Sequence, residues 1–504
     1  MNIYIRAVIT LLLLPTPLKT EYLSGEYYFE GSSPTVTEKI SASVGTAGAY
    51  RLTVFENGVL IEGADSDGVY YGRLTLSQLL LNYRGYLPCL VIEDEPAYSY
   101  RGFMIDPCRH FFTVDEIKKM VDSAALFKFN KFHFHLSDDQ GFRVEIDSYP
   151  LLSTVGSVRN GSHFNKNENS FEKYGGFYTK DELRDIVAYC AEKHIEIIPE
   201  FDLPGHTTAV IAAYPELCCT GKKIDLKERG GIFDDILCAG NPDTLVMIKA
   251  VLDEFCELFP GEYIHIGGDE APKVRWQECE KCRAALKNNG FTDFEQLQGW
   301  LLNEIAAYLK TKGKKAICWN DALKGGNLSA DNITVALWMD KKGETAKWAN
   351  AGNPVIVETF TPYYVDYPYG MHPLKSVFHY DPHKAGGFNK KGAQSVLGVE
   401  SPIWTEHVAD IDRMEYMCFP RWLAVAETGW HGAGGSYRAF LKNAAFYADI
   451  LRERGVNCAP KKDWDVGPVS RLSQTAGFFL NAATKENVLN LLKKDSKQGD
   501  LQDD

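Results

Sequence analysis

From about residue 98 onward, short runs of β-branched or aromatic residues alternate with longer stretches of helical spacing, and this alternation constrains the fold more than any other feature. It is typical of a parallel sheet whose strands are joined by crossover helices. Residues 114–127, 180–193 and 294–311 are predicted helices, with Thr113 and Thr179 as N-caps of the first two. Eight strand runs favour a closed (β/α)8 barrel. The runs are residues 100–105, 131–136, 195–199, 263–266, 315–319, 334–338, 354–359 and 396–404.

The main alternative architecture is an open doubly wound sheet. Neither of its phosphate-binding fingerprints, GxGxxG and GxxxxGK[ST], follows any of the runs. In a barrel, functional residues lie at the C-terminal ends of the strands. Polar or aromatic side chains follow every predicted strand, so we expect them to meet at one end of the barrel. They are Arg109, Asp138, Asp139, Glu200, Asp202, His206, Asp269, Glu270, Trp319, Trp338, Tyr364, Asp366, Trp404 and Glu406.

The segments on either side of the barrel region, residues 98–455, have different patterns. Residues 21–97 predict a small α+β domain, with strands at 49–54 and 59–62, an Asn57-Gly58 hairpin signal between them, and a helix over 68–80. Residues 456–504 predict a helical extension that ends in an acidic tail at 500–504. Residues 1–20 resemble a secretory signal peptide, because Arg6 precedes an apolar run; a buried first strand or helix is the alternative.

Charge and glycosylation signals limit the kinds of partner. The formal net charge of −13 disfavours binding to nucleic acid or anionic membranes, which select clustered Lys and Arg. No stretch approaches the ~18 apolar residues that a membrane span needs, so we expect no span in the mature chain. Asn160, Asn327 and Asn332 begin Asn-x-Ser/Thr triplets. With the signal-like start, these triplets predict a secreted or lysosomal glycoprotein.

Twelve cysteines fit an oxidising compartment. Cys218-Cys219 and Cys279-x-x-Cys282 are the two closely spaced pairs. A zinc knuckle would need a second ligand pair at suitable spacing, and no partner CxxC or HxxxH is present. We therefore predict a disulfide between the 218/219 and 279/282 neighbourhoods and no metal site.

Two adjacent carboxylates, Asp269 and Glu270, follow the fourth predicted strand. Most glycosidases place two carboxylates on opposite sides of the scissile bond, about 5 Å apart or more. Adjacent residues cannot bracket a bond in that way, but the turn after Gly267-Gly268 can present both side chains to one pocket. One carboxylic acid could then protonate the leaving oxygen while its neighbour holds a substrate group. The nucleophile would come from the substrate.

Four segments carry a more specific signal: His265-Ile266-Gly267-Gly268-Asp269-Glu270, Arg109-His110-Phe111, His133-x-His135-Leu136-Ser137-Asp138-Asp139-Gln140 and Pro199-Glu200-Phe201-Asp202-Leu203-Pro204-Gly205-His206. Together they resemble the β-N-acetylhexosaminidases of glycoside hydrolase family 20. The resemblance covers residues 98–455, and the preceding segment is similar to the family's small noncatalytic domain. It implies retaining hydrolysis of terminal non-reducing GlcNAc or GalNAc from β-linked oligosaccharides and glycoconjugates through an oxazolinium intermediate, with no cofactor and with homodimerisation as an option.

The resemblance also implies roles for three residues in the chemistry. Glu270 would act as general acid and then as general base, for which a raised pKa is expected. Asp269 would bind the acetamido N–H and stabilise the developing positive charge. Tyr364 would donate its hydroxyl to the acetamido oxygen.

The other residues would recognise the sugar or support the acid, again by resemblance. Those expected to contact the 3-, 4- and 6-hydroxyls are Arg109, Glu406 and Asp366. Those expected to wall the pocket are Trp319, Trp338 and Trp404. Those expected to form a second layer are Asp138 and His206, which would orient Glu270, and Glu200 and Asp202, which would support His206.

Two alternatives from other classes are open. A metallohydrolase would use His133-x-His135 as a metal motif and could recruit His206 and Asp269, but a Lys and a second late His are missing at the later strand ends. A carbohydrate-binding protein on a degenerate barrel would be expected to have lost its acid, whereas Glu270 is present.

Overall fold

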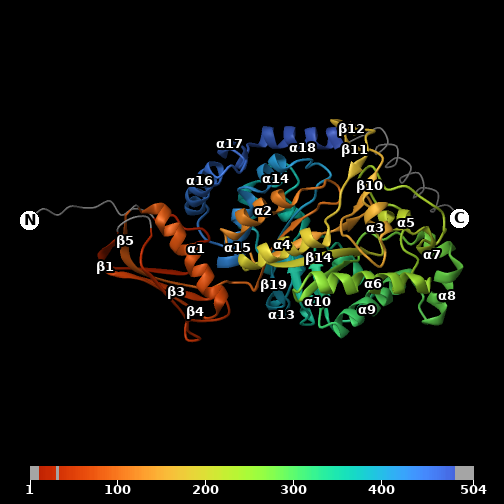
Figure 1. Ribbon diagram of the computed structural model, residues 1–504, viewed down its shortest axis with the longest axis horizontal. Helices are drawn as coiled ribbons and strands as arrows, with labels where there is room; N and C mark the ends of the chain where they lie inside the picture. The colour runs from red at the N-terminus through yellow and green to blue at the C-terminus, as the bar shows by residue number, and fades with distance from the viewer. Residues whose placement is uncertain (1–10, 30–32, 84, 483–504) are drawn as a thin grey trace, which may run out of the picture.

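The computed structural model describes residues 11–29, 33–83 and 85–482, which form a small α+β domain beside a large barrel domain (Figure 1). The barrel is closed by eight parallel strands in the order β14-β15-β16-β17-β18-β19-β6-β7. The predicted (β/α)8 architecture is therefore confirmed. The strands are β6 (Tyr100–Ile105), β7 (Lys131–His135), β14 (Glu196–Leu203), β15 (Tyr263–Gly267), β16 (Lys315–Trp319), β17 (Ile333–Leu337), β18 (Val355–Val357) and β19 (Val396–Ile403).

The two-residue repeat of the strands decides which side chains enter the barrel. On β7, Phe132 and Phe134 belong to the apolar core between the strands and the surrounding helices, whereas His133 and His135 bond to carboxylates inside the barrel. β14 continues to Leu203, beyond the predicted end at residue 199, and carries Glu200 and Asp202 with it. The barrel interior is therefore rich in buried charge.

The helices around the barrel begin at identifiable caps. α2 (Val114–Ala125) and α4 (Lys180–Glu192) both start with a capping box, formed by Thr113 with Glu116 and by Thr179 with Glu182. α9 spans Phe294–Thr311, as predicted. The other long helices of the barrel domain are α6 (Pro242–Leu258), α15 (Arg421–His431) and α16 (Tyr437–Glu453).

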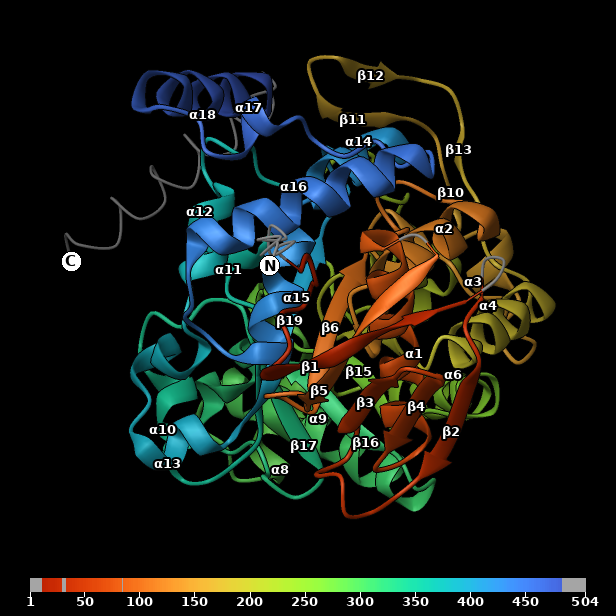
Figure 2. The ribbon, with the colours of Figure 1, turned by 90° about the vertical axis from the view of Figure 1, so that its left-hand side faces the viewer.

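The small domain has a five-stranded sheet and one long helix. The strand order is β1-β5-β3-β4-β2, and β3 pairs with β4 through a tight turn at the predicted hairpin. In Figure 2 the strands of this sheet lie in front of the barrel. The elements are β1 (Lys19–Tyr28), β2 (Val36–Ile40), β3 (Tyr50–Phe55), β4 (Gly58–Gly63), α1 (Ser66–Asn82) and β5 (Tyr86–Asp94).

A buried polar network joins the two domains. Asp94 at the end of β5 accepts hydrogen bonds from Lys128 Nζ (3.1 Å) and Trp430 Nε1 (2.9 Å), and Arg101 donates to the hydroxyl of Tyr71 at 2.8 Å. Arg101 and Lys128 lie at or just before the starts of strands β6 and β7. The small domain therefore packs on the N-terminal ends of the strands and leaves the C-terminal ends free.

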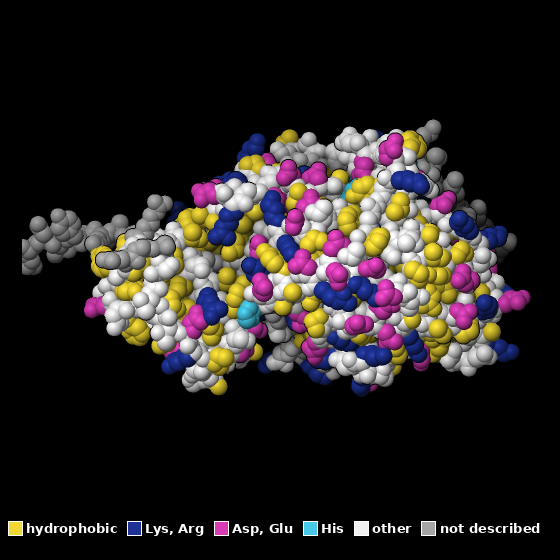
Figure 3. Space-filling view, in the orientation of Figure 1, with side chains coloured by type: hydrophobic (Ala, Val, Ile, Leu, Met, Phe, Trp, Pro, Cys, Tyr) yellow, Lys and Arg dark blue, Asp and Glu magenta, His cyan; other side chains and the backbone are white. Residues whose placement is uncertain are grey.

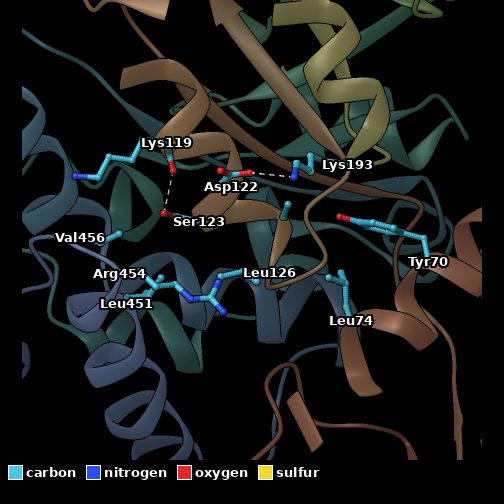
Figure 4. Close-up of a pocket in the computed structure, with 11 residues that line it drawn as sticks. Tyr70, Leu74, Lys119, Asp122, Ser123, Leu126, Lys193, Leu451, Arg454 and Val456 are labelled. Atoms are coloured by element: carbon cyan, nitrogen blue, oxygen red, sulfur yellow. Dashed lines mark hydrogen bonds and ion pairs between the residues drawn. The ribbon is translucent and has the colours of Figure 1, made fainter. Parts of the chain in front are cut away.

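A cavity of about 360 Å³ lies where α1 faces α2 and the segment after α16 (Figure 4). Asp122 and Lys193 form an ion pair of 3.3 Å beside it, and Tyr70 and Leu74 come from α1. None of the residues that the sequence predicts for the functional site lines this cavity.

Residues 11–20 are part of the fold. Leu13 and Leu14 are buried, and the Asn443 side chain donates to Leu13 O at 2.7 Å. β1 begins at Lys19. A leader ending at residue 20, as predicted, would include core residues and the first residues of β1, so the structure favours the alternative of a buried segment for residues 11–20. Residues 1–10 lie outside the described residues.

The C-terminal extension contains α17 (Lys461–Trp464) and α18 (Pro468–Ala482) within the described range. The predicted acidic tail, residues 500–504, lies outside it. Over the described parts of the chain, no helix has the length and apolarity to cross a membrane. On the face shown in Figure 3, basic and acidic side chains are interspersed without a basic patch, in keeping with the net charge.

Candidate active site

A strained turn after β15 carries the two adjacent carboxylates. Gly267 and Gly268 have φ values of +65° and +107°, and Glu270 itself has φ +40°. A Cβ on Gly267 would lie 1.7 Å from Asp202 Oδ1, so only glycine fits there. A left-handed non-glycine residue costs about 1–3 kcal/mol, and such strain is common at functional sites. The side chains of Asp269 and Glu270 remain 13% and 31% exposed.

His206 connects two pairs of carboxylates. Its Nε2 lies 3.7 Å from Asp269 Oδ2 and 3.6 Å from Glu270 Oε2, while Nδ1 lies 3.3 Å from Asp138 Oδ1 and 3.2 Å from Asp139 Oδ2. Burial by itself would lower the pKa of His206, but the surrounding carboxylates, Asp138 above all, raise it well above its ordinary value. His206 is therefore an imidazolium between Asp138–Asp139 and Asp269–Glu270.

The two carboxylates of the turn have opposite pKa shifts. Burial and the neighbouring charge of Glu270 raise the pKa of Asp269 to about 7. Burial would also raise the pKa of Glu270, but the hydrogen bond and charge of His206 outweigh it and hold that pKa below its ordinary value of 4.5. The prediction of a raised pKa for Glu270 is therefore wrong for the protein without substrate. The sequence did not show that His206 lies close to the Glu270 carboxylate. In the protein without substrate, Asp269 therefore binds a proton more readily than Glu270 does.

Asp321 is a site residue that the sequence reading missed. It lies in η2 (Asn320–Gly325), directly after β16, and accepts a hydrogen bond from the Glu270 backbone N–H at 3.2 Å. Lys324 forms a 2.8 Å ion pair with it. Its place two residues after Trp319 at a strand end was the signal that could have found it. Asp321 thus holds the strained backbone of Glu270.

Replacement of Asp321 by alanine is expected to lower kcat about tenfold with little change in KM. A hydrogen bond to a charged group contributes about 1.5–3 kcal/mol, and about 1.4 kcal/mol of barrier is tenfold in rate. Steady-state kinetics of Asp321→Ala measure this effect. Lys324→Ala is the matched control, because it removes the ion pair but keeps Asp321, and its kcat should stay close to that of the unchanged protein. An equal loss in both variants would show that the ion pair, not the hydrogen bond, positions Glu270.

Three carboxylates hold the Arg109 side chain at the same end of the barrel. Its guanidinium lies 2.6 Å from Asp138, 3.1 Å from Asp106 and 3.8 Å from Glu406, and it lies over the ring of Trp404 at 4.9 Å. These charges, which outweigh burial, raise its pKa well above the ordinary value. Asp106, which the sequence reading also missed, fixes the Arg109 side chain from the end of β6.

Among the residues predicted to contact the substrate, four buried polar atoms have no hydrogen-bond partner in the described part of the chain. They are Asp269 Oδ1, Asp366 Oδ1, Trp338 Nε1 and Trp404 Nε1. Buried polar groups in native proteins are nearly always satisfied, and exceptions cluster where a ligand binds. Two acceptors and two donors are therefore available to a polar ligand at this end of the barrel.

Tyr364 faces the same region from the chain after β18. It follows α11 (Phe360–Tyr363), and its ring centroid lies 6.1 Å from that of Trp404. Burial raises the pKa of its hydroxyl well above the ordinary value, and the charges of Glu358, Asp269 and Asp366 raise it further. Tyr364 therefore stays a neutral hydroxyl donor at this end of the barrel.

Trp319 and Glu200 lie deeper than predicted. Trp319 is only 1% exposed, and its Nε1 donates to Glu200 at 2.9 Å, so it forms the floor of the site rather than a wall. The expectation that Glu200 supports His206 is wrong. Its hydrogen-bond partners are His133 (3.0 Å), His135 and His265 (2.7 Å), because the parallel register puts it level with His135 and His265.

Asp202 has a different environment from Glu200. Burial and the charge of Asp269 raise its pKa well above the ordinary value, although the charge of His206 lowers it. Its Oδ1 is another buried atom without a partner in the described chain. The Asp202 carboxyl therefore holds a proton more readily than an exposed aspartate does.

Buried carboxylates surround both histidines of the His133-x-His135 pair. His133 lies between Glu400 (2.7 Å) and Glu200, and His135 lies between Glu200 and Asp138 (2.8 Å). Burial would lower the pKa of His133, but Glu400 and Glu200 raise it to about 9. The two histidines thus act as charge partners beneath the site.

Comparison with known proteins places both domains in one family. The family model described as "Glycosyl hydrolase family 20, catalytic domain" matches residues 98–433, and that of "Glycosyl hydrolase family 20, domain 2" matches residues 30–95.

Individual relatives agree with the family match. A protein of Porphyromonas gingivalis named beta-hexosaminidase is 39% identical over 403 residues, which are 76% of this chain and 50% of that protein. A beta-hexosaminidase of Akkermansia muciniphila is 34% identical over 426 residues, which are 81% of this chain and 84% of that protein. This chain thus spans half the length of the Porphyromonas relative.

Solved structures share the architecture. The crystal structure of a GH20 exo β-N-acetylglucosaminidase from Vibrio harveyi, in complex with N-acetylglucosamine, has a TM-score of 0.79 at 28% identity. The match covers 89% of this chain and 78% of that chain.

Proposed function

This chain belongs to glycosyl hydrolase family 20, and from that we propose that it is a β-N-acetylhexosaminidase that removes terminal non-reducing N-acetylhexosamine residues from β-linked glycans. The observation that carries the proposal is the strained turn after β15, which places Asp269 and Glu270 side by side within 3.7 Å of His206. Adjacent carboxylates suit a reaction whose nucleophile is the acetamido group of the substrate.

The reaction proceeds in two steps. In the first, the acetamido oxygen attacks the anomeric carbon, the glycosidic C–O bond breaks, and the proton of Glu270 passes to the leaving oxygen. Asp269 accepts a hydrogen bond from the acetamido N–H and stabilises the positive charge of the oxazolinium ring. In the second, Glu270 takes a proton from water, which attacks the anomeric carbon and reopens the ring. Two inversions give net retention.

The unpartnered polar atoms support the binding mode. Asp269 Oδ1 can accept the acetamido N–H, and Asp366 Oδ1 can accept a sugar hydroxyl, the 6-hydroxyl in our assignment. Trp338 and Trp404 offer their Nε1 donors and apolar ring faces. Arg109 and Glu406, which are already 3.8 Å apart, are assigned to the 3- and 4-hydroxyls.

The identity of the nucleophile gives the most direct test of the function. The protein is expected to hydrolyse a chromogenic β-N-acetylglucosaminide and to leave the corresponding β-glucoside intact, since a 2-hydroxyl cannot form the oxazolinium ring. Equal rates on both substrates would exclude substrate assistance. Full activity after dialysis against EDTA would exclude the metallohydrolase alternative.

Because of the Asp269–Glu270 pair, kcat/KM should begin to fall with rising pH near pH 7, which gives its pH profile a basic limb there. The productive form holds one proton on Glu270 and none on Asp269, so the pair as a whole must carry one proton. Because the pKa of Asp269 is about 7, this proton is lost above that pH, and kcat/KM should fall about tenfold per pH unit there. The acid limb should lie below pH 4.5, the ordinary pKa of a glutamate, because the pKa of Glu270 is lowered.

Substrate binding should move the proton to the position that the reaction needs. The acetamido N–H stabilises ionised Asp269, while the sugar covers the exposed part of Glu270 and disfavours its charge. A discontinuous assay of kcat/KM from about pH 3 to pH 9 measures both limbs. A rate that keeps rising above pH 8 would contradict the shared proton.

Location in the secretory route, secreted or lysosomal, is a further part of the proposal. It is supported by one of the three glycosylation triplets, since the apolar run after Arg6 that suggested a leader ends in Leu13 and Leu14, which are buried in the fold. Asn160 is exposed, whereas the side chains of Asn327 and Asn332 donate hydrogen bonds to backbone carbonyls and are partly buried. Glycan should therefore be found at Asn160 in peptide mass mapping of protein from a glycosylating host. Glycan at Asn327 or Asn332 alone would contradict this assignment.

Homodimerisation is the last part of the proposal. Its support is α18, whose exposed apolar side chains Val469, Leu472 and Leu480 repeat at helical spacing. Light scattering of the purified chain is expected to give twice the mass of the monomer, and Leu472→Glu is expected to reduce it. A monomer at all concentrations would remove this part of the proposal without affecting the activity.

A further inference from the structure

Four cysteine thiols converge outside the carboxylate site. They are Cys219, Cys238, Cys279 and Cys282, which we call the four-thiol cluster, and their sulfur atoms all lie within 4.8 Å of one another. The separations are 3.5 Å between Cys238 and Cys282, 3.7 Å between Cys219 and Cys282, and 3.7 Å between Cys238 and Cys279. Cys218 does not take part, because its sulfur accepts a hydrogen bond from Thr220.

The sulfur–sulfur distances distinguish a metal site from disulfides. Sulfur atoms in a disulfide are about 2.05 Å apart. Four sulfurs around a zinc ion, with Zn–S bonds of about 2.3 Å, form a tetrahedron with edges of about 3.8 Å. The observed separations of 3.5–3.7 Å match the tetrahedron. None of the twelve cysteines is bridged in the structure, so the predicted disulfide between the 218/219 and 279/282 neighbourhoods is not confirmed.

The cluster joins two segments that follow neighbouring barrel strands. Cys219 and Cys238 lie in the loop after β14, residues 204–241, which we call loop 3. Cys279 and Cys282 lie in the loop after β15, residues 268–293, which we call loop 4. Loop 4 contains α7 (Val274–Glu278) and α8 (Glu280–Asn288), which lie at the end of the molecule opposite to the small domain (Figure 1).

Loops 3 and 4 fit closely where the thiols meet. A Cβ on Gly240 would lie 2.4 Å from the backbone nitrogen of Cys282, so a glycine is needed for this approach. Trp276 of loop 4 is fully buried and donates through Nε1 to Leu237 O at 2.9 Å, next to Cys238. Cys238 and Cys282 are 2% and 0% exposed. Cys219 and Cys279 are partly buried. The four sulfurs are therefore held in a preformed site.

We propose that Cys219, Cys238, Cys279 and Cys282 bind one zinc ion as a tetrathiolate that fastens loop 3 to loop 4. Zinc is the ion that four thiolates in a closed tetrahedral site select, apart from redox-active iron. With all four positions taken by protein ligands the site is structural. By fastening the two loops together, the zinc site would hold His206 of loop 3 in position relative to Asp269 and Glu270 of loop 4. The inference stands independently of the proposed activity.

Metal content of the full chain tests the proposal. Elemental analysis of protein purified without added metal is expected to give about one zinc per chain and no iron, and the protein should be colourless. Cys238→Ser and Cys282→Ser should each reduce the zinc to near zero. Cys256→Ser is the matched control, because Cys256 is a partly buried free thiol on α6 outside the cluster, and its zinc content should be unchanged. Metal-free protein, or iron in place of zinc, would overturn the proposal.

Two further measurements keep the proposal testable if the serine variants do not fold. Titration of the unchanged protein with a mercurial reagent should release its zinc as four thiols react, detected with a metal-sensitive dye. Thiol counting after denaturation in chelator should give all twelve cysteines as free thiols. A count of eight, with Cys219–Cys282 and Cys238–Cys279 linked in mass mapping, would show two disulfides in place of the metal and overturn the assignment.

Discussion

Glu270→Gln is expected to lower kcat/KM for a β-N-acetylglucosaminide with a sugar leaving group by about 10³-fold, within the range of general acid catalysis. A nitrophenyl leaving group departs without full protonation, so its first step should slow far less. The difference between the two substrates isolates the proton transfer, because both place the same sugar beside Asp269. Presteady-state and steady-state rates with both leaving groups measure it.

A control variant separates this effect from a general disturbance of loop 4. Glu278→Gln changes an exposed glutamate at the end of α7 in the same loop, and it should leave both rates unchanged. If Glu270→Gln slowed the first step equally for the two leaving groups, Glu270 would not be the leaving group's acid.

Asp269→Asn is expected to lower kcat for N-acetylated substrates by about 10²–10³-fold, the effect of removing one group that stabilises transition-state charge. The amide cannot balance the positive charge of the oxazolinium ring. The basic limb of kcat/KM should also move to lower pH, because the remaining proton must be held by Glu270 alone, whose pKa is lowered. Rates over the same pH range as for the unchanged protein measure both effects. A variant that kept the limb near pH 7 would show that another group sets it.

Thermal stability gives a second readout for Asp269→Asn. Because the pKa of Asp269 is raised from its ordinary value of 3.8 to about 7, folding favours the protonated carboxyl. The unchanged protein therefore loses stability as the pH rises from about 4 to about 7, and asparagine removes this loss. The variant should have the higher Tm at pH 8, with a difference that narrows toward pH 4. A lower Tm at pH 8 would show that the substitution disturbs packing, so that the loss of rate could not be assigned to charge.

The sequence by itself determined the barrel and where its functional end lies. Strand alternation, helical spacing and caps are local signals, and each of the eight predicted strands is present, with Thr113 and Thr179 capping their helices. The residues after the strands then had to meet, because parallel strands bring their C-terminal ends together. Arg109, Asp138, His206, Asp269, Glu270 and Glu406 are accordingly linked by ion pairs.

Only the tertiary structure decided which of these groups are in contact, and therefore how readily each of them binds a proton. Glu200 bonds to three histidines and not to His206, and the closeness of His206 reverses the expected pKa order of Asp269 and Glu270. Such shifts depend on distances of a few ångströms between residues that are far apart in the chain.

The four-thiol cluster shows the same limit most clearly. The sequence presented Cys279-x-x-Cys282 without a second pair, because Cys219 and Cys238 are separated by a folded loop rather than by a short motif. The close approach of loops 3 and 4 at Gly240 brings the four sulfurs within 4.8 Å of one another. Spacing along the chain reports only neighbours within one element, whereas ligand sets and proton positions are fixed by packing between elements.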